Sequence, residues 1–167
     1  MKNRRDYSYY EAHAADVNLD EITSSEKNKQ ILQWLRDGKI KSIEVGRSDW
    51  YSNYFCFSKG DDLRWLGYFI GRSESLQELT IDGFSGGLQR MVHALSDGIA
   101  RNQSIQQVSV RSVRSGRKNG FAKIAGVLGN LTQLEKFYYS DYTHNNDPLI
   151  DCVTIGTLLE SGVWNLK

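Results

Sequence analysis

The residue types that most often carry chemistry are scattered along this chain. The three histidines, His13, His93 and His144, have no spacing that suits a shared metal ion, and neither cysteine lies near them. A zinc site needs its nitrogen and sulfur ligands close together, and a nucleophile elbow needs a strand before its serine and a helix after it. The segment GRSES at 71–75 follows a helical pattern and precedes a strand pattern, which is the reverse order. We therefore expect no catalytic residue, no metal and no cofactor, and interpret the chain as a non-enzyme.

One basic segment, RSVRSGRK at 111–118, offers groups that could contact phosphate: Arg111, Arg114, Arg117 and Lys118. The whole chain is nearly neutral, with 21 Lys and Arg against 20 Asp and Glu. This balance gives no long-range attraction to nucleic acid or to an anionic membrane. We interpret the segment as a solvated loop between a strand and a helix, and nucleic-acid binding through it stays open as the weaker alternative.

Length and composition indicate a folded protein with its own core. The chain has 167 residues, of which 40% are hydrophobic and 25% are charged. Its apolar stretches are short and interrupted by charge, so we expect no transmembrane helix. No apolar region follows the basic start of the chain, so we expect no secretory signal and a cytoplasmic location. With two cysteines, Cys56 and Cys152, a disulfide framework is not expected, and both are interpreted as small buried hydrophobes.

A repeated pattern dominates the sequence from about residue 30 onward. Four segments read apolar, two polar, apolar, polar, apolar: IKSIEV at 40–45, LQELTI at 76–81, IQQVSV at 105–110 and LEKFYY at 134–139. Their first residues are 36, 29 and 29 residues apart. The alternation at the end of each segment is typical of a strand. A further strand is expected near Leu166.

Helical periodicity precedes each of these strands. One stripe of apolar residues at three- and four-residue spacing runs through Leu88, Met91, Val92, Leu95 and Ile99. Similar stripes precede the other strands. A helix–strand unit cannot bury its apolar side alone, so stacked units are expected to share one core between parallel strands and a layer of helices.

These segments and their 29-residue spacing resemble the leucine-rich repeat family, in particular its ribonuclease-inhibitor-like members with long, helix-containing repeats. The resemblance implies an α/β fold: a curved right-handed solenoid of four to five helix–strand repeats over 26–167, with a parallel sheet on its concave face. It also implies a protein-binding function. Phe137 and Tyr139 stand where leucines are usual, and the asparagine or cysteine common after the third leucine is not clear in this sequence.

Two segments fall outside the repeat. Residues 1–25 are interpreted as a mobile tail or as a cover draped over the end of the solenoid. The aromatic segment 50–57 fits either a ligand-contacting loop or a strand or loop packed against the helices, and we favour packing. The chain stops where another strand begins, so we also expect either self-association through an open C-terminal end or a longer parent protein.

The polar positions between the core residues of the last three strands are the candidate protein-binding site. These positions are Glu78, Thr80, Gln107, Ser109, Lys136 and Tyr138. Their charges are mixed, which suits a folded protein or a peptide better than a phosphate backbone. We therefore predict a non-catalytic interaction scaffold for a protein partner, with a regulator that binds and inhibits an enzyme as the alternative.

Overall fold

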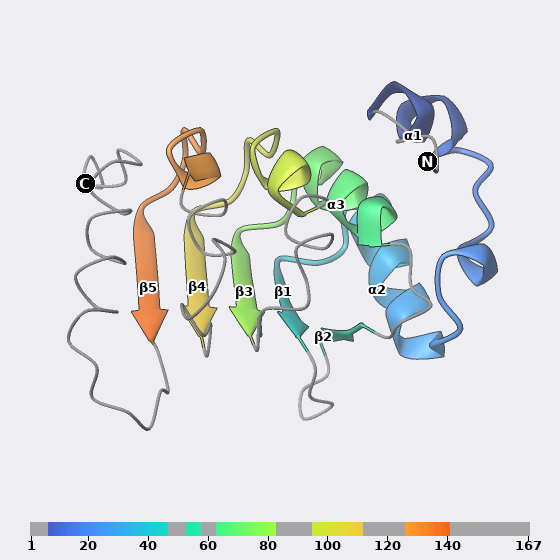
Figure 1. Ribbon diagram of the computed structural model, residues 1–167, viewed down its shortest axis with the longest axis horizontal. Coiled ribbons are helices and arrows are strands. Elements are labelled where there is room, and N and C mark those ends of the chain that lie inside the picture. The colour runs from blue at the N-terminus through green and yellow to red at the C-terminus, as the bar shows by residue number, and fades with distance from the viewer. Residues whose placement is uncertain (1–6, 47–52, 58–62, 83–94, 112–125, 141–167) are drawn as a thin grey trace, which may run out of the picture.

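The computed structural model describes residues 7–46, 53–57, 63–82, 95–111 and 126–140. Its centre is a five-stranded, all-parallel sheet in the order β2-β1-β3-β4-β5 (Figure 1). The strands are β1 (Ser42–Gly46), β2 (Tyr54–Cys56), β3 (Glu78–Asp82), β4 (Gln107–Arg111) and β5 (Lys136–Ser140). The helices are α1 (Tyr7–His13), α2 (Glu26–Arg36) and α3 (Leu63–Arg72), with a 3-10 turn, η1 (Leu19–Glu21), between α1 and α2. The expected α/β architecture with parallel strands is confirmed.

The four strands predicted from the repeated pattern all form, and each begins two residues after the first apolar residue of its pattern. They pair in the register that the pattern predicts: Leu79 faces Ile43 on β1 and Val108 on β4, and Val108 faces Phe137 on β5. The fifth strand of the sheet is not the one expected near Leu166, which lies outside the described residues. It is β2, which pairs with the other side of β1.

Equivalent backbone groups bond each strand to the next just before the strands begin. The carbonyl oxygen of Lys41 accepts hydrogen bonds from the amides of Gln77 and Glu78, at 2.8 and 2.9 Å. The carbonyl of Gln77 does the same for Gln106 and Gln107, and that of Gln106 for Glu135 and Lys136. Serine hydroxyls add a second recurrent bond, since Ser75 donates to the carbonyl of Ile40 and Ser104 to that of Leu76, each at 2.8 Å. Sequence positions that match in the pattern therefore make matching contacts.

The core lies between one face of the sheet and the helices. The strands contribute Ile43, Val45, Leu79, Ile81, Val108 and Val110, and the helical segments contribute Ile31, Leu32, Leu35, Leu66, Ile70, Leu95, Ile99 and Leu128, all of them buried. Most of these residues belong to the predicted helical stripes and strand positions. Leu88, Met91 and Val92 of the longest stripe lie outside the described residues.

Local signals explain where α2 begins and ends. The hydroxyl of Ser25 accepts a hydrogen bond from the amide of Asn28 at 3.3 Å, which caps the first turn. At the other end Gly38 has a φ of 66°, and the amide of Lys39 donates to the carbonyl of Trp34 at 2.8 Å. This left-handed glycine followed by a six-residue closing bond is the Schellman ending of a helix.

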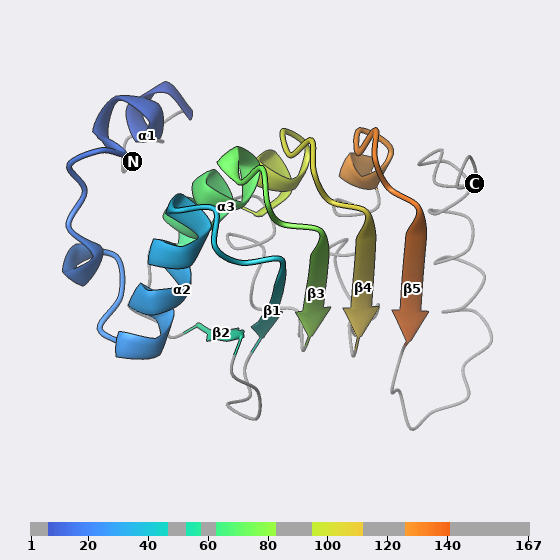
Figure 2. The same ribbon diagram turned by 180° about the vertical axis from the view of Figure 1, so that it is seen from behind.

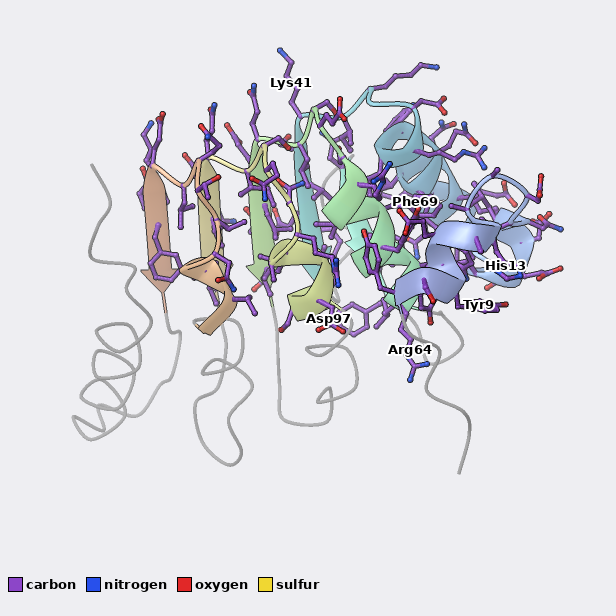
Figure 3. All side chains as sticks on the ribbon, turned by 90° about the horizontal axis from the view of Figure 1, so that it is seen from above. Tyr9, His13, Lys41, Arg64, Phe69 and Asp97 are labelled. Atoms are coloured by element: carbon purple, nitrogen blue, oxygen red, sulfur yellow. The ribbon has the colours of Figure 1, made fainter. Side chains whose placement is uncertain are left out.

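The N-terminal segment lies against the outer side of α3. Tyr10 of α1 is buried in the core, with its ring edge-on to that of Trp65 at 4.8 Å between centroids. Tyr7 contacts the ring of Tyr68, and the guanidinium of Arg101 lies 4.1 Å from the centre of the Tyr7 ring. In Figure 3, Tyr9 and His13 of the same helix lie at the end of the molecule away from β5.

No helix among the described residues is long and apolar enough to span a membrane.

Candidate functional site: the open face of the sheet

The sheet has one face without a helix from the described part of the chain. In Figure 2, strands β1, β3, β4 and β5 lie side by side with no described helix in front of them. We call this side the open face. Because side chains alternate across a strand, the residues between the core positions must point to it. The predicted binding residues are therefore all placed on one surface.

Strand pairing aligns these residues into three rows across the open face. Row one holds Ser42, Glu78, Gln107 and Lys136, row two holds Glu44, Thr80, Ser109 and Tyr138, and row three holds Asp82, Arg111 and Ser140. The six candidate residues of the sequence analysis occupy three adjacent strands in rows one and two. Their proximity follows from the register, while their role in binding stays a prediction.

The accessibility of the candidates differs along the rows. Tyr138 is the only large hydrophobic side chain among the described residues that is strongly exposed, at 54%. Glu78 and Lys136 are exposed as well, and Thr80 and Gln107 are half-buried. Ser109 is only 5% exposed. The accessible part of the candidate site is therefore concentrated at Glu78, Lys136 and Tyr138.

A charged group crosses the centre of the open face. The guanidinium of Arg111 on β4 lies 4.0 Å from the carboxylate of Glu44 on β1, so its side chain reaches over β3. Burial raises the pKa of the Glu44 carboxyl, and Asp82 raises it further, whereas Arg111 opposes the rise. Arg111 is the first residue of the basic segment 111–118, and the remainder of that segment lies outside the described residues. In the structure Arg111 belongs to the sheet, opposite Asp82 of β3.

Aromatic packing closes the β2 end of the open face. Tyr54 pairs in register with Glu44, and its side chain is fully buried. Its ring lies over Gly46, where any side chain would collide with the Tyr54 hydroxyl. Phe55 and Phe57 are also buried, which agrees with the packing interpretation of this aromatic segment. Trp50 and Tyr51 lie outside the described residues.

A buried amide holds β2 in place. Asn28 of α2 donates from its side chain to the carbonyl of Cys56 at 2.7 Å and accepts from the amide of Cys56 at 3.2 Å. These bonds satisfy both backbone groups of Cys56 on the side of β2 away from β1. Cys56 is only half-buried, which corrects the expectation of a buried cysteine. Cys152 lies outside the described residues.

Four residues besides the six candidates shape this face: Glu44, Tyr54, Asp82 and Arg111. The places of Glu44, Asp82 and Arg111 follow from the same repeated pattern and register as those of the candidates. Tyr54 had no such signal because β2 lacks the repeated pattern. The arrangement of hydroxyls, amides, charges and one exposed ring suits noncovalent recognition. Within the described ranges, no three His, Cys, Asp or Glu residues are grouped closely enough to hold a metal ion.

Comparison of the chain with protein-family models gives no match, and neither does comparison with curated proteins.

Proposed function

We propose that residues 26–167 form a curved right-handed solenoid of the leucine-rich repeat type and that it acts as a non-catalytic scaffold for a protein partner. The partner would bind the open face through Glu78, Thr80, Gln107, Ser109, Lys136 and Tyr138. The observation that carries this proposal is the alignment of these residues in two rows on a face that no helix of the described ranges covers, with Tyr138 54% exposed at the end of one row. Tyrosine supplies a large contact area at small entropic cost, so it is the best anchor available there.

The recurrent bonds before the strands support the solenoid part of the proposal. A carbonyl at the same pattern position accepts two amides in three successive units, and Ser75 and Ser104 repeat one side-chain bond. Asn102 adds a contact between units, because its buried amide donates to the carbonyls of Ile70 and Ser73 at 2.7 and 2.9 Å. Units that differ in sequence but share these bonds would stack in one direction, as repeats do.

The N-terminal segment has a place in the same proposal. End units of a solenoid expose an apolar side that needs a cover. We propose that α1 and η1 serve as this cover, with Tyr10 supplying buried aromatic area against Trp65. Residues 1–25 would then stabilise the fold and leave recognition to the open face.

Site-specific crosslinking tests whether a protein occupies the open face. A photoreactive phenylalanine analogue would replace Tyr138, and in a matched protein it would replace the exposed Thr132, which precedes β5 outside the rows. After irradiation in cell extract, we expect one distinct crosslinked protein from the Tyr138 position and none of that protein from the Thr132 position. Equal crosslinking from both positions, or none from either, would contradict the proposal. If the captured protein is an enzyme, its activity with and without the scaffold separates the inhibitor alternative from simple scaffolding.

A further inference from the structure

The charged residues of the open face are acidic on one pair of strands and basic on the other pair. Strands β1 and β3 place Glu44, Glu78 and Asp82 on it, together with uncharged residues. Strands β4 and β5 place Arg111 and Lys136 on it, again with uncharged neighbours. We call β1 with β3 the acidic half and β4 with β5 the basic half. The Arg111 guanidinium extends over β3 to Glu44, so the change of sign across the strands is carried by row one, where Glu78 and Lys136 are exposed.

The most accessible charged residues of the two halves occupy the same register position on their strands. Glu78 and Lys136 belong to row one and are separated by Gln107 alone. Both side chains are exposed, and neither forms an ion pair with another residue in the part of the chain that the structure describes. Strands lie about 4.8 Å apart, so the two charged groups are roughly 10 Å from each other. Both are therefore available to a ligand that crosses the strands.

The change from acidic to basic residues across the sheet occurs in the rows and is not shared by the residues that immediately precede the strands. There the order is the opposite, since Lys41 precedes β1 and Glu135 precedes β5. The backbone carbonyl of Lys41 is engaged by the amides of Gln77 and Glu78 at this edge. A ligand guided by the polarity of the rows would thus be placed over the strands.

We infer that the partner crosses the open face with a cationic group over the acidic half, a carboxylate over the basic half and an apolar side chain against Tyr138. This inference rests on the proposed function and adds the chemistry of the partner: a protein segment with oppositely charged ends. Opposite charges across an interface give specificity and suppress wrong partners, because like charges placed together are costly. A nucleic acid would fit poorly, since its phosphates would have to pass Glu78 and Asp82 to cross the sheet.

A short synthetic peptide is a sufficient probe. Five strands span about 19 Å, and an extended peptide of about seven residues covers roughly 23 Å. The probe is a capped, fluorescein-labelled heptapeptide with two lysines, Ser-Leu-Ser and two glutamates in that order. Matched probes carry four lysines or four glutamates around the same centre, and a labelled single-stranded oligonucleotide represents nucleic acid. Fluorescence anisotropy at low ionic strength gives each dissociation constant, and added salt is expected to weaken binding of the mixed-charge peptide.

Charge reversals in row one make the test specific. Glu78→Lys and Lys136→Glu are each expected to raise the dissociation constant of the mixed-charge peptide by about threefold to tenfold, because each replaces an attraction by a repulsion. For the double variant, the dissociation constant is expected to return to within about threefold of that of the unaltered protein, because the peptide can bind in the reversed direction. Glu74→Lys is the matched control, since Glu74 is exposed but lies before β3 and outside the rows. It should change the affinity by less than about twofold.

Several results would overturn the inference. One is that a single-charge peptide or the oligonucleotide binds at least as tightly as the mixed-charge peptide. Another is that the row-one reversals have no more effect than Glu74→Lys, or that the double variant binds no better than the single ones. Crosslinking at Tyr138 separates this failure from failure of the proposed function. If a protein is captured there but peptide affinity does not depend on the order of charges, the proposed function is supported and the inference about charge is refuted. If no protein is captured and peptide affinity does not depend on charge order, both are refuted.

Discussion

Replacing Gly98 with alanine should destabilise the fold because two backbones approach each other there. A Cβ on Gly98 would lie 2.5 Å from the carbonyl carbon and 2.9 Å from the Cα of Gly67 in α3, and still closer to the carbonyl oxygen. These are backbone atoms, which cannot rotate away as a side chain would. Carbon atoms prefer a separation of about 3.5 Å, so the two segments would have to part by roughly 1 Å. That separation would loosen the buried Leu66, Leu95 and Ile99 beside the contact.

The expected cost is about 2 kcal/mol in the free energy of unfolding. Forcing an extra methyl group into a packed interior costs about 1–3 kcal/mol, and a rigid backbone obstacle favours the upper end of that range. Alanine is a better helix former than glycine by about 1 kcal/mol, which offsets part of the strain. Gly98 lies in the helical turn 95–99, so this gain applies to it. The balance remains destabilising.

Urea unfolding followed by tryptophan fluorescence and far-UV circular dichroism measures this change. With a typical slope of about 2 kcal/mol per M, the midpoint should fall by about 1 M. Gly126→Ala is the control: Gly126 is helical and exposed, and a Cβ there meets nothing within 4 Å. It should be neutral or stabilising by up to about 1 kcal/mol. If Gly98→Ala is as stable as Gly126→Ala, the close contact between Gly98 and Gly67 does not exist.

Three further changes probe the core, the contacts between units and the charged centre. Leu79→Ala should cost about 2–5 kcal/mol because the side chain is buried, and a loss below about 1 kcal/mol in urea unfolding would place it outside the core. Asn102→Ala should cost about 2–4 kcal/mol, since it leaves the carbonyls of Ile70 and Ser73 without their amide donor, and a thermal melt equal to that of the original protein would refute this. For Glu44 the folded pKa is raised, so protonation favours the folded state: this contribution is complete below the unfolded pKa and is lost as pH rises through the folded one. Glu44→Gln should therefore remove a fall in stability that begins as pH rises above the usual glutamate pKa of about 4.3, and an unchanged pH profile of the melting temperature would contradict the assignment.

The sequence predicted the sheet well because the repeated pattern marks each strand independently. The apolar positions of IQQVSV and LQELTI fix which side chains face the core, and a shift of one residue would have turned them outward. The pairing of Leu79 with Val108 therefore follows from local information. The placement of the six candidate residues on one face follows for the same reason.

Features that depend on contacts between distant segments were not visible in the sequence. The short strand β2 forms because β1 offers a free edge and Asn28 holds its backbone, and neither fact is encoded within residues 54–56. The side-chain amide of Asn102 donates to backbone carbonyls of the unit before it, which no local pattern indicates. Gly98 gave no signal because its partner Gly67 is 31 residues away.

The most direct test of the central claim is the affinity of the crosslinked partner for Tyr138→Ala. Tyr138 is the one strongly exposed large hydrophobic residue among those described, so its loss should weaken binding by more than about 1 kcal/mol, or about fivefold in the dissociation constant. Isothermal titration calorimetry measures this, with Arg117→Ala in the basic segment as the comparison. We expect Tyr138→Ala to weaken binding and Arg117→Ala to leave the affinity unchanged. The reverse result, an unchanged affinity for Tyr138→Ala and a loss for Arg117→Ala, would contradict the proposed site and move it to the basic segment 111–118.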